Sequence, residues 1–123
     1  MRPVQLTVVG ATASTPFLPD IYQNPFQIGI GVSATGLLGT TNLSWAIEHC
    51  FDYTTVINPL WNGNSSVTWF QNSGLGGNSS GTSLLTANGN YAFAVAAIRL
   101  NVYSAGNATT VVTANFIQSV NSP

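Results

Sequence analysis

Charge is the scarcest property of this sequence. Only 4% of its 123 residues are charged, lysine is absent, and the formal net charge is −1. A chain of this composition lacks the basic surface with which proteins bind nucleic acids or anionic membranes. It also lacks the charge repulsion that normally keeps soluble proteins apart. We therefore expect neither a nucleic acid nor a membrane as partner, and we expect a protein that works within an assembly.

Cysteine and long apolar runs are scarce as well. The one cysteine, Cys50, excludes an internal disulfide bond. No stretch approaches the roughly 18 apolar residues of a transmembrane helix, and the first residues lack the apolar run of a signal peptide. We expect no membrane span and no targeting segment. At 123 residues, 45% of them hydrophobic, the chain is long enough for one domain over residues 1–123 with a core of its own.

What the sequence does contain is alternation of apolar and other residues with a period of two. The clearest stretch follows Asn88-Gly89, a pair typical of tight turns. In this stretch one face of the predicted strand carries the apolar residues Ala96, Ile98, Leu100 and Val102. We predict a central strand over residues 96–103 that pairs as a hairpin with a strand over 109–118.

Similar short segments at residues 4–9, 26–32, 43–51, 67–71 and 83–86 are separated by glycine, asparagine and proline. No stretch shows a sustained helical period. The glycine-rich residues 74–81 are predicted to form a flexible surface loop. The pattern predicts an all-β fold, a single-domain antiparallel β-sandwich. Long connections at residues 10–25 and 53–66 favour strands that cross between sheets, and hence a jelly-roll or Greek-key arrangement.

Residues 11–25 contain three prolines and no periodicity. Because proline cannot donate a ladder hydrogen bond, this segment is predicted to be an extended arm or ordered loop. Its large apolar side chains exceed what a loop normally carries. We take them as a candidate interface: Phe17, Leu18, Ile21 and Tyr22.

Arg99 is one of two basic residues and is included among the candidate interface residues. It shares a predicted strand face with Asn101 and Tyr103. An ion pair with Glu48 or Asp52 across neighbouring strands is the favoured interpretation of Arg99, ahead of a ligand contact.

Catalytic chemistry has few residues to draw on. His49 and Cys50 are adjacent on a predicted strand and therefore point to opposite faces, which disfavours a Cys–His nucleophile pair. Glu48 and Asp52 lie about 13 Å apart along a strand, wider than the ~5–9 Å of glycosidase carboxylates. No metal-ligand spacing and no phosphate-binding loop is present. We expect no enzyme activity, no metal and no cofactor.

Three tryptophans have two possible roles. Trp45, Trp61 and Trp69 are predicted to be core and interface anchors. The alternative is that exposed tryptophans stack on sugars in a carbohydrate-binding module.

Several short motifs resemble those of small virion proteins of tailed bacteriophages. They are Pro19-Asp-Ile-Tyr22, His49-Cys-Phe-Asp52, Thr68-Trp-Phe70 and Ala97-Ile-Arg-Leu-Asn101. The resemblance extends from about Pro19 onward, and its motifs are structural rather than catalytic. It implies a cement or decoration subunit that binds the major capsid protein, commonly as a trimer. It also implies a location on the capsid surface of the virion, after assembly in the host cytoplasm. A tail or neck component is an alternative.

We predict that the protein forms a homo-oligomer, a trimer according to the resemblance. The physical reason is an uncharged surface combined with apolar arm residues that one small domain does not need. Stable interfaces bury about 800 Å² per partner, which a few aromatic anchors and a strand edge supply. Light scattering at micromolar concentration should give a trimeric mass. A monomeric mass would contradict the prediction.

Overall fold

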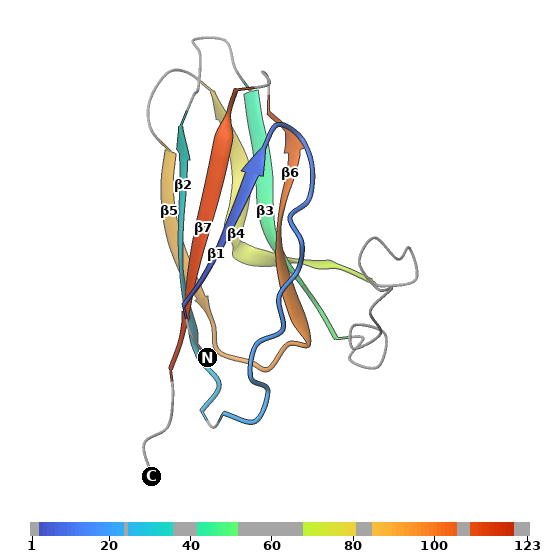
Figure 1. The fold of residues 1–123 in the computed structure, drawn as a ribbon, viewed down its shortest axis with the longest axis vertical. Coiled ribbons are helices and arrows are strands. Elements are labelled where there is room, and N and C mark those ends of the chain that lie inside the picture. The colour runs from blue at the N-terminus through green and yellow to red at the C-terminus, as the bar shows by residue number, and fades with distance from the viewer. Residues whose placement is uncertain are drawn as a thin grey trace.

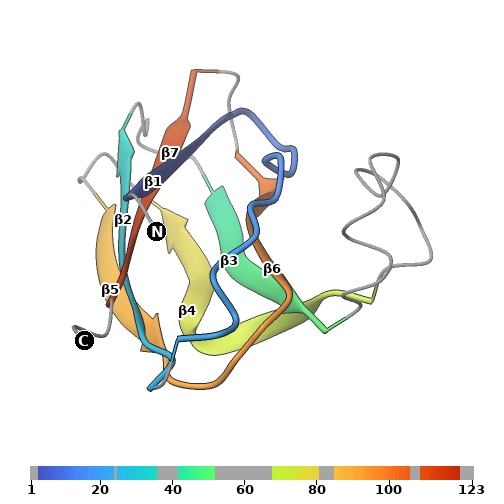
Figure 2. The same ribbon diagram turned by 60° about the horizontal axis from the view of Figure 1, so that its bottom comes forward.

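Two antiparallel sheets lie face to face in a computed structural model of the chain (Figures 1 and 2). The structure describes residues 3–23, 25–35, 42–51, 68–80, 85–105 and 109–119. Seven strands run through these residues: β1 (Val4–Val9), β2 (Ile28–Thr35), β3 (Asn42–Cys50), β4 (Phe70–Ser80), β5 (Leu85–Tyr91), β6 (Ala97–Ser104) and β7 (Val111–Gln118). The described residues include no helix, and hence none with the length and apolar character to cross a bilayer. The prediction of an all-β sandwich is confirmed.

The strands change sheet repeatedly along the chain. One sheet has the order β1-β7-β2-β5 and the other the order β4-β3-β6. Only β3 and β4 are neighbours both in sequence and in a sheet, while the chain crosses between sheets after β2, β4, β5 and β6. The prediction that the long connections at residues 10–25 and 53–66 join strands of different sheets was wrong. The first lies between β1 and β2 of one sheet and the second between β3 and β4 of the other, so the crossings occur at other connections.

Alternation decides which side of each strand is buried. In β2 the side chains of Ile28, Ile30 and Val32 face the core, while Gly29 and Gly31 are exposed. β6 and β7 alternate in the same way. The largest fully buried side chains come from both sheets and the segments next to them: Tyr91, Phe116, Ile28, Leu43, Ile47, Leu75, Ile98, Leu100, Val95, Val102 and Val112.

Two predictions about pairing were wrong. The strand over residues 96–103 exists as β6, but β3 and not β6 is the middle strand of its sheet. The hairpin between this strand and residues 109–118 does not form, because β7 lies in the other sheet between β1 and β2. The alternation was read correctly, but alternation specifies a face and leaves the partner strand open.

Two predictions about glycine were also wrong. Asn88-Gly89 makes no turn and lies within β5, where Gly31 pairs with Asn88 and Ile30 with Gly89. The supposed loop at residues 74–81 is strand β4 as far as Ser80. The reason is close approach: a Cβ on Gly76 would lie 3.1 Å from the Trp45 carbonyl oxygen, and one on Gly89 would lie 2.8 Å from Leu75 Cγ. These glycines make room for a neighbour.

The described residues of the segment 11–25 form no strand, but they follow the free edge of β6. Ser14 N donates to Leu100 O at 2.8 Å, and Phe17 and Ile98 exchange two backbone hydrogen bonds of 3.0 and 3.1 Å. Farther along, Asp20 N donates to Gln118 Oε1, while Gln118 Nε2 donates to Asp20 O. The segment is thus anchored to one sheet through β6 and to the other through β7.

We predict that Gly89→Ala lowers the free energy of unfolding by about 1–3 kcal/mol, because the added methyl group overpacks the buried side chain of Leu75. Gly31→Ala is the matched control, since a Cβ there meets no atom within 4 Å. Denaturant unfolding of both variants measures the difference. Equal stability of the two variants would contradict the close-packing explanation.

Candidate functional site

The candidate interface residues of the arm divide between the inside and the outside of the domain. Phe17 packs against the core, with its ring centroid 4.8 Å from that of Phe116. Leu18 and Tyr22 are exposed, Tyr22 by 84%. Ile21 is half-buried and lines a shallow hollow of about 240 Å³ together with Phe51. Leu18 and Tyr22 therefore remain as the outward-facing apolar side chains of the arm.

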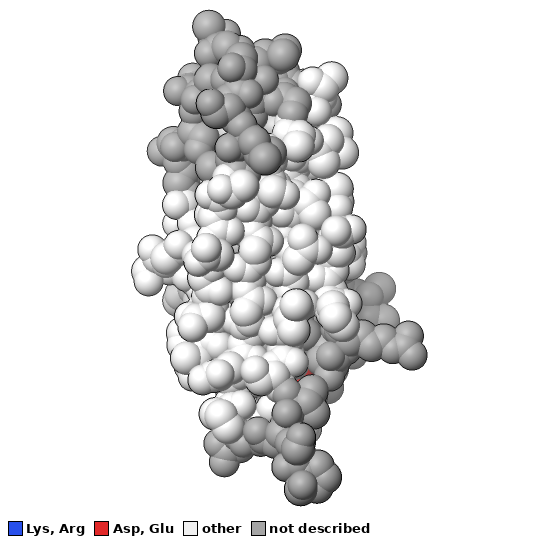
Figure 3. Space-filling model, turned by 90° about the vertical axis from the view of Figure 1, so that its left-hand side faces the viewer, with Lys and Arg blue, Asp and Glu red and all other residues white. Residues whose placement is uncertain are grey.

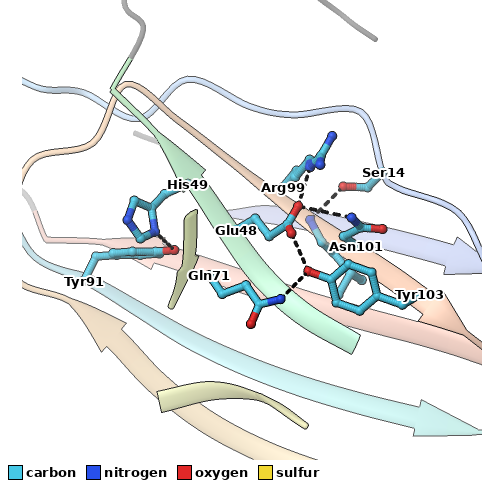
Figure 4. Close-up of polar contacts among 9 residues, drawn as sticks. Ser14, Glu48, His49, Gln71, Tyr91, Arg99, Asn101 and Tyr103 are labelled. Atoms are coloured by element: carbon cyan, nitrogen blue, oxygen red, sulfur yellow. Dashed lines mark hydrogen bonds and ion pairs between the residues drawn. The ribbon is translucent and has the colours of Figure 1, made fainter. Parts of the chain in front are cut away.

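Arg99 lies in a polar network on one face of β3, β4 and β6 (Figure 4). Arg99 Nε donates to Glu48 Oε1 at 2.7 Å, and Asn101 Nδ2 donates to the same oxygen at 3.2 Å. Tyr103 donates its hydroxyl proton to Glu48 Oε2 and accepts a hydrogen bond from Gln71 Nε2. The predicted ion pair with Glu48 is confirmed; Asp52 lies outside the described residues.

The network neutralises its own charges. The Glu48 carboxylate is buried and meets three donors, which a buried carboxylate requires. Burial, with the nearby carboxylate, raises the pKa of Tyr103 to about 12, so its hydroxyl stays a donor at neutral pH. The Arg99 guanidinium lies 4.2 Å from the ring centroid of Trp69. Among the candidate interface residues, Arg99 is therefore already engaged within the domain.

His49 points away from this network, to the opposite side of β3 (Figure 4). Its Nδ1 atom lies 2.8 Å from the Tyr91 hydroxyl, so the pair joins β3 of one sheet to β5 of the other. Cys50 is buried with Ala96 and Ala97 on the other face of β3. In the described part of the chain, no three His, Cys, Asp or Glu residues are grouped so that they could hold a metal ion.

Around His49 four aromatic rings gather at one end of the sandwich. Tyr91, Phe51 and Phe93 meet the imidazole edge-on at centroid distances of 5.0, 5.3 and 5.5 Å, and Phe70 stacks on it at 6.0 Å. Tyr91 is fully buried. Phe51, Phe70 and Phe93 are each about half exposed, at 54%, 47% and 50%. We call these five residues the aromatic cluster.

A cleft of about 640 Å³ opens beside the aromatic cluster, between the β4 and β5 edges of the two sheets. Its described lining combines aromatic, amide and small residues: His49, Phe51, Phe70, Gln71, Asn72, Ser73, Gly74, Asn88, Gly89, Asn90, Ala92 and Phe93. Asn72 braces the cleft by donating to Asn90 O at 3.2 Å and accepting from Gly74 N at 2.9 Å.

The two tryptophans within the described residues, Trp45 and Trp69, take no part in this cleft. Trp45 is buried in the core, Trp69 is half-buried beside Arg99, and Trp61 lies outside the described residues. The anchor role predicted for Trp45 is confirmed. The exposed aromatic rings among the described cleft residues belong instead to phenylalanines.

Comparison of the sequence with known protein families and with curated proteins finds no match.

Sequence reasoning missed the cleft because its lining comes from distant parts of the chain. Phe51, Phe70 and Phe93 are far apart in sequence and lie at or next to strand ends. Asn88 and Asn90 were assigned to or beside a turn. The one usable signal was His49, the single histidine of the sequence, with Phe51 two residues after it.

We predict that His49 makes stability fall in mildly acidic solution. Burial lowers the pKa of His49, with Glu48 opposing the shift, so the folded protein binds the proton less tightly than the unfolded chain. The unfolded chain therefore binds more protons below about pH 6.5, and the free energy of unfolding decreases as the pH falls through that value. Tyr91, the other titratable group facing His49, has a raised pKa and stays protonated.

Denaturant unfolding between pH 7.5 and 5 measures this dependence. His49→Gln should flatten it, while Tyr91→Phe keeps the buried imidazole and should retain it. Hydrogen bonds from Gln23 and Tyr22 lower the pKa of Asp20. Protonation of Asp20 therefore reduces stability only near and below the ordinary carboxyl pKa of 3.8. An unchanged slope in His49→Gln would refute the assignment.

Proposed function

We propose that this protein is a non-enzymatic virion structural protein, a cement or decoration subunit that binds the major capsid protein on a bacteriophage head. In this proposal it acts as a homotrimer and stabilises the head through apolar and main-chain contacts. The observation that carries the proposal is a described surface rich in exposed apolar side chains and almost without free charge. The resemblance of its motifs to small phage virion proteins adds the context.

The charge side of this argument rests on few residues. Arg99 and Glu48 neutralise each other within the domain, and the Asp20 carboxylate accepts hydrogen bonds from Tyr22 N and Gln23 Nε2. The side of the molecule along which β5 runs is nearly free of charged atoms in its described part (Figure 3). A surface of this kind favours contacts that depend on apolar burial rather than on ion pairs.

The apolar side of the argument rests on side chains spread over several elements. Those exposed are Val9, Leu18, Tyr22, Phe51, Phe70, Phe93, Tyr103 and Ile117. Of these, the proposal assigns Leu18 and Tyr22 of the arm to the interface, where a few residues carry most of the binding energy.

Open strand edges supply the main-chain part of the proposed contacts. Within the described residues, β1 pairs only with β7, β5 only with β2 and β4 only with β3. Each of these edge strands leaves backbone groups that a strand of a neighbouring subunit is able to pair with.

We also propose that the sandwich is a jelly roll, the eight-stranded architecture common in viral capsid proteins. The support is the path of the arm: residues 12–17 bond to β6 on the side away from β3 and so occupy the position of an eighth strand. Each sheet then has four members. The same arrangement would serve a tail or neck component, for which the structure offers no separate support.

We predict that attachment to heads lacking this protein depends little on salt, because almost no exposed charge is present to be screened. Co-sedimentation in low salt and in about 1 M salt, where the Debye length is about 3 Å, measures this. The double variant Leu18→Ser, Tyr22→Ser should lose at least about tenfold in affinity, or ~1.4 kcal/mol.

Point variants are preferred to deletion of the arm, since its hydrogen bonds to β6 and the packing of Phe17 make deletion destabilising. Ile117→Ser is the matched control, being an exposed apolar residue on another element. Loss of wild-type attachment in high salt would refute the apolar mechanism. Full attachment of the double variant would refute the role of the arm, and failure to bind heads at all would refute the proposed function.

A further inference from the structure

The cleft between β4 and β5 has an amphipathic lining of a particular kind. One end is formed by the exposed rings of Phe51, Phe70 and Phe93, and the wall along β5 by Asn88 and Asn90. Its volume of about 640 Å³ falls within the ~300–1,000 Å³ typical of small-molecule sites. A protein partner would instead require a contact surface of about 800 Å². The dimensions therefore favour a ligand of a few rings.

The aromatic end is held in a fixed arrangement. The buried pair His49–Tyr91 lies beneath it, and Phe93 meets both members at 5.5 Å. Phe51 lies 5.7 Å from Phe70 and 6.3 Å from Phe93, so the three exposed rings form one continuous apolar surface. Preorganised ring faces reduce the entropy that a ligand must overcome on binding.

The amide wall consists of Asn88 and Asn90, which border the cleft along β5, lie two residues apart on this strand and are both exposed. Within the described residues the side chains of Asn88 and Asn90 make no hydrogen bond, although the Asn90 carbonyl accepts one from Asn72. A primary amide donates two hydrogen bonds through its nitrogen and accepts through its carbonyl oxygen. It can therefore pair with hydroxyl groups, which both donate and accept hydrogen bonds. Gly74 and Ala92 add small residues to the lining.

The described part of the lining carries no charge. None of its described residues is Asp, Glu, Lys or Arg, and the buried His49, with its lowered pKa, is neutral at pH 7. A charged ligand would lose hydration without gaining an ion pair. The remaining chemistry is that of an uncharged molecule with an apolar face and a rim of hydroxyl groups. A pyranose ring has this form, with a C–H face that packs on aromatic rings.

We infer that this cleft binds a neutral oligosaccharide, with a sugar ring on the surface of Phe51, Phe70 and Phe93 and its hydroxyls bonded to Asn88 and Asn90. This inference is independent of attachment to a capsid. It differs from recognition by tryptophan, since the rings are those of phenylalanine.

The test uses the intact chain on an array of oligosaccharides ending in glucose, galactose, mannose or N-acetylglucosamine, beside sialylated and sulfated ones. Calorimetry then measures affinity for the best neutral oligosaccharide found. Phe93→Leu keeps apolar volume but removes the ring face, and Asn90→Ala removes the amide. Each should weaken binding at least about tenfold, equivalent to ~1.4 kcal/mol. Phe93→Tyr should retain binding.

Tyr22→Leu is the control, because it removes an exposed aromatic ring outside the cleft. Light scattering compares the mass of Phe93→Leu with that of the wild type, and so tests whether a second copy of the chain occupies the cleft instead. Three results would overturn the inference. The first is that no neutral oligosaccharide binds at about 1 mM, since a Kd of 1 mM is equivalent to a binding free energy of about −4.1 kcal/mol. The other two are binding confined to sialylated or sulfated oligosaccharides, and full affinity in Phe93→Leu. A changed mass without glycan binding would assign the cleft to self-association and overturn it equally.

Discussion

The hydrogen bond between His49 and Tyr91 joins the two sheets at the end of the sandwich that carries the aromatic cluster. Both groups are polar and buried, and leaving either without its partner would cost about 1–3 kcal/mol. The bond therefore sets how β3 and β5 face each other. Phe51, Phe70 and Phe93 take their positions from the imidazole, and the cleft opens beside them.

On the opposite face of β3, the Glu48 network performs a different task. It gathers a buried carboxylate, its guanidinium partner and three further polar side chains from β4 and β6. Breaking a buried ion pair costs more than the pair contributes, so such a network specifies register more than it adds stability. Its consequence for function is that two of the few charges of the chain are used internally. The proposed functions therefore rely on apolar side chains, amides and strand edges.

The arm shows how one segment serves both fold and surface. Its backbone bonds to β6, Phe17 enters the core, and Leu18 and Tyr22 remain exposed within a few residues of it. An apolar segment with prolines is consistent with either role. Only the direction of each side chain decides between the roles, and that direction follows from which edge the backbone pairs with.

Local pattern alone determined the all-β class, the existence of most strands and the buried face of β2 and β6, because alternation with a period of two is a property of neighbouring residues. It also placed His49 and Cys50 on opposite faces and favoured an ion pair of Arg99 with Glu48 or Asp52, of which the structure shows the pair with Glu48. The order of strands in each sheet was decided only by the tertiary structure, since alternation does not name a partner. The same holds for Gly89, whose role is to admit Leu75 from the other sheet rather than to turn the chain. The aromatic cluster and the amide wall also required the folded chain, because residues distant in sequence become neighbours only where the edges of two sheets meet.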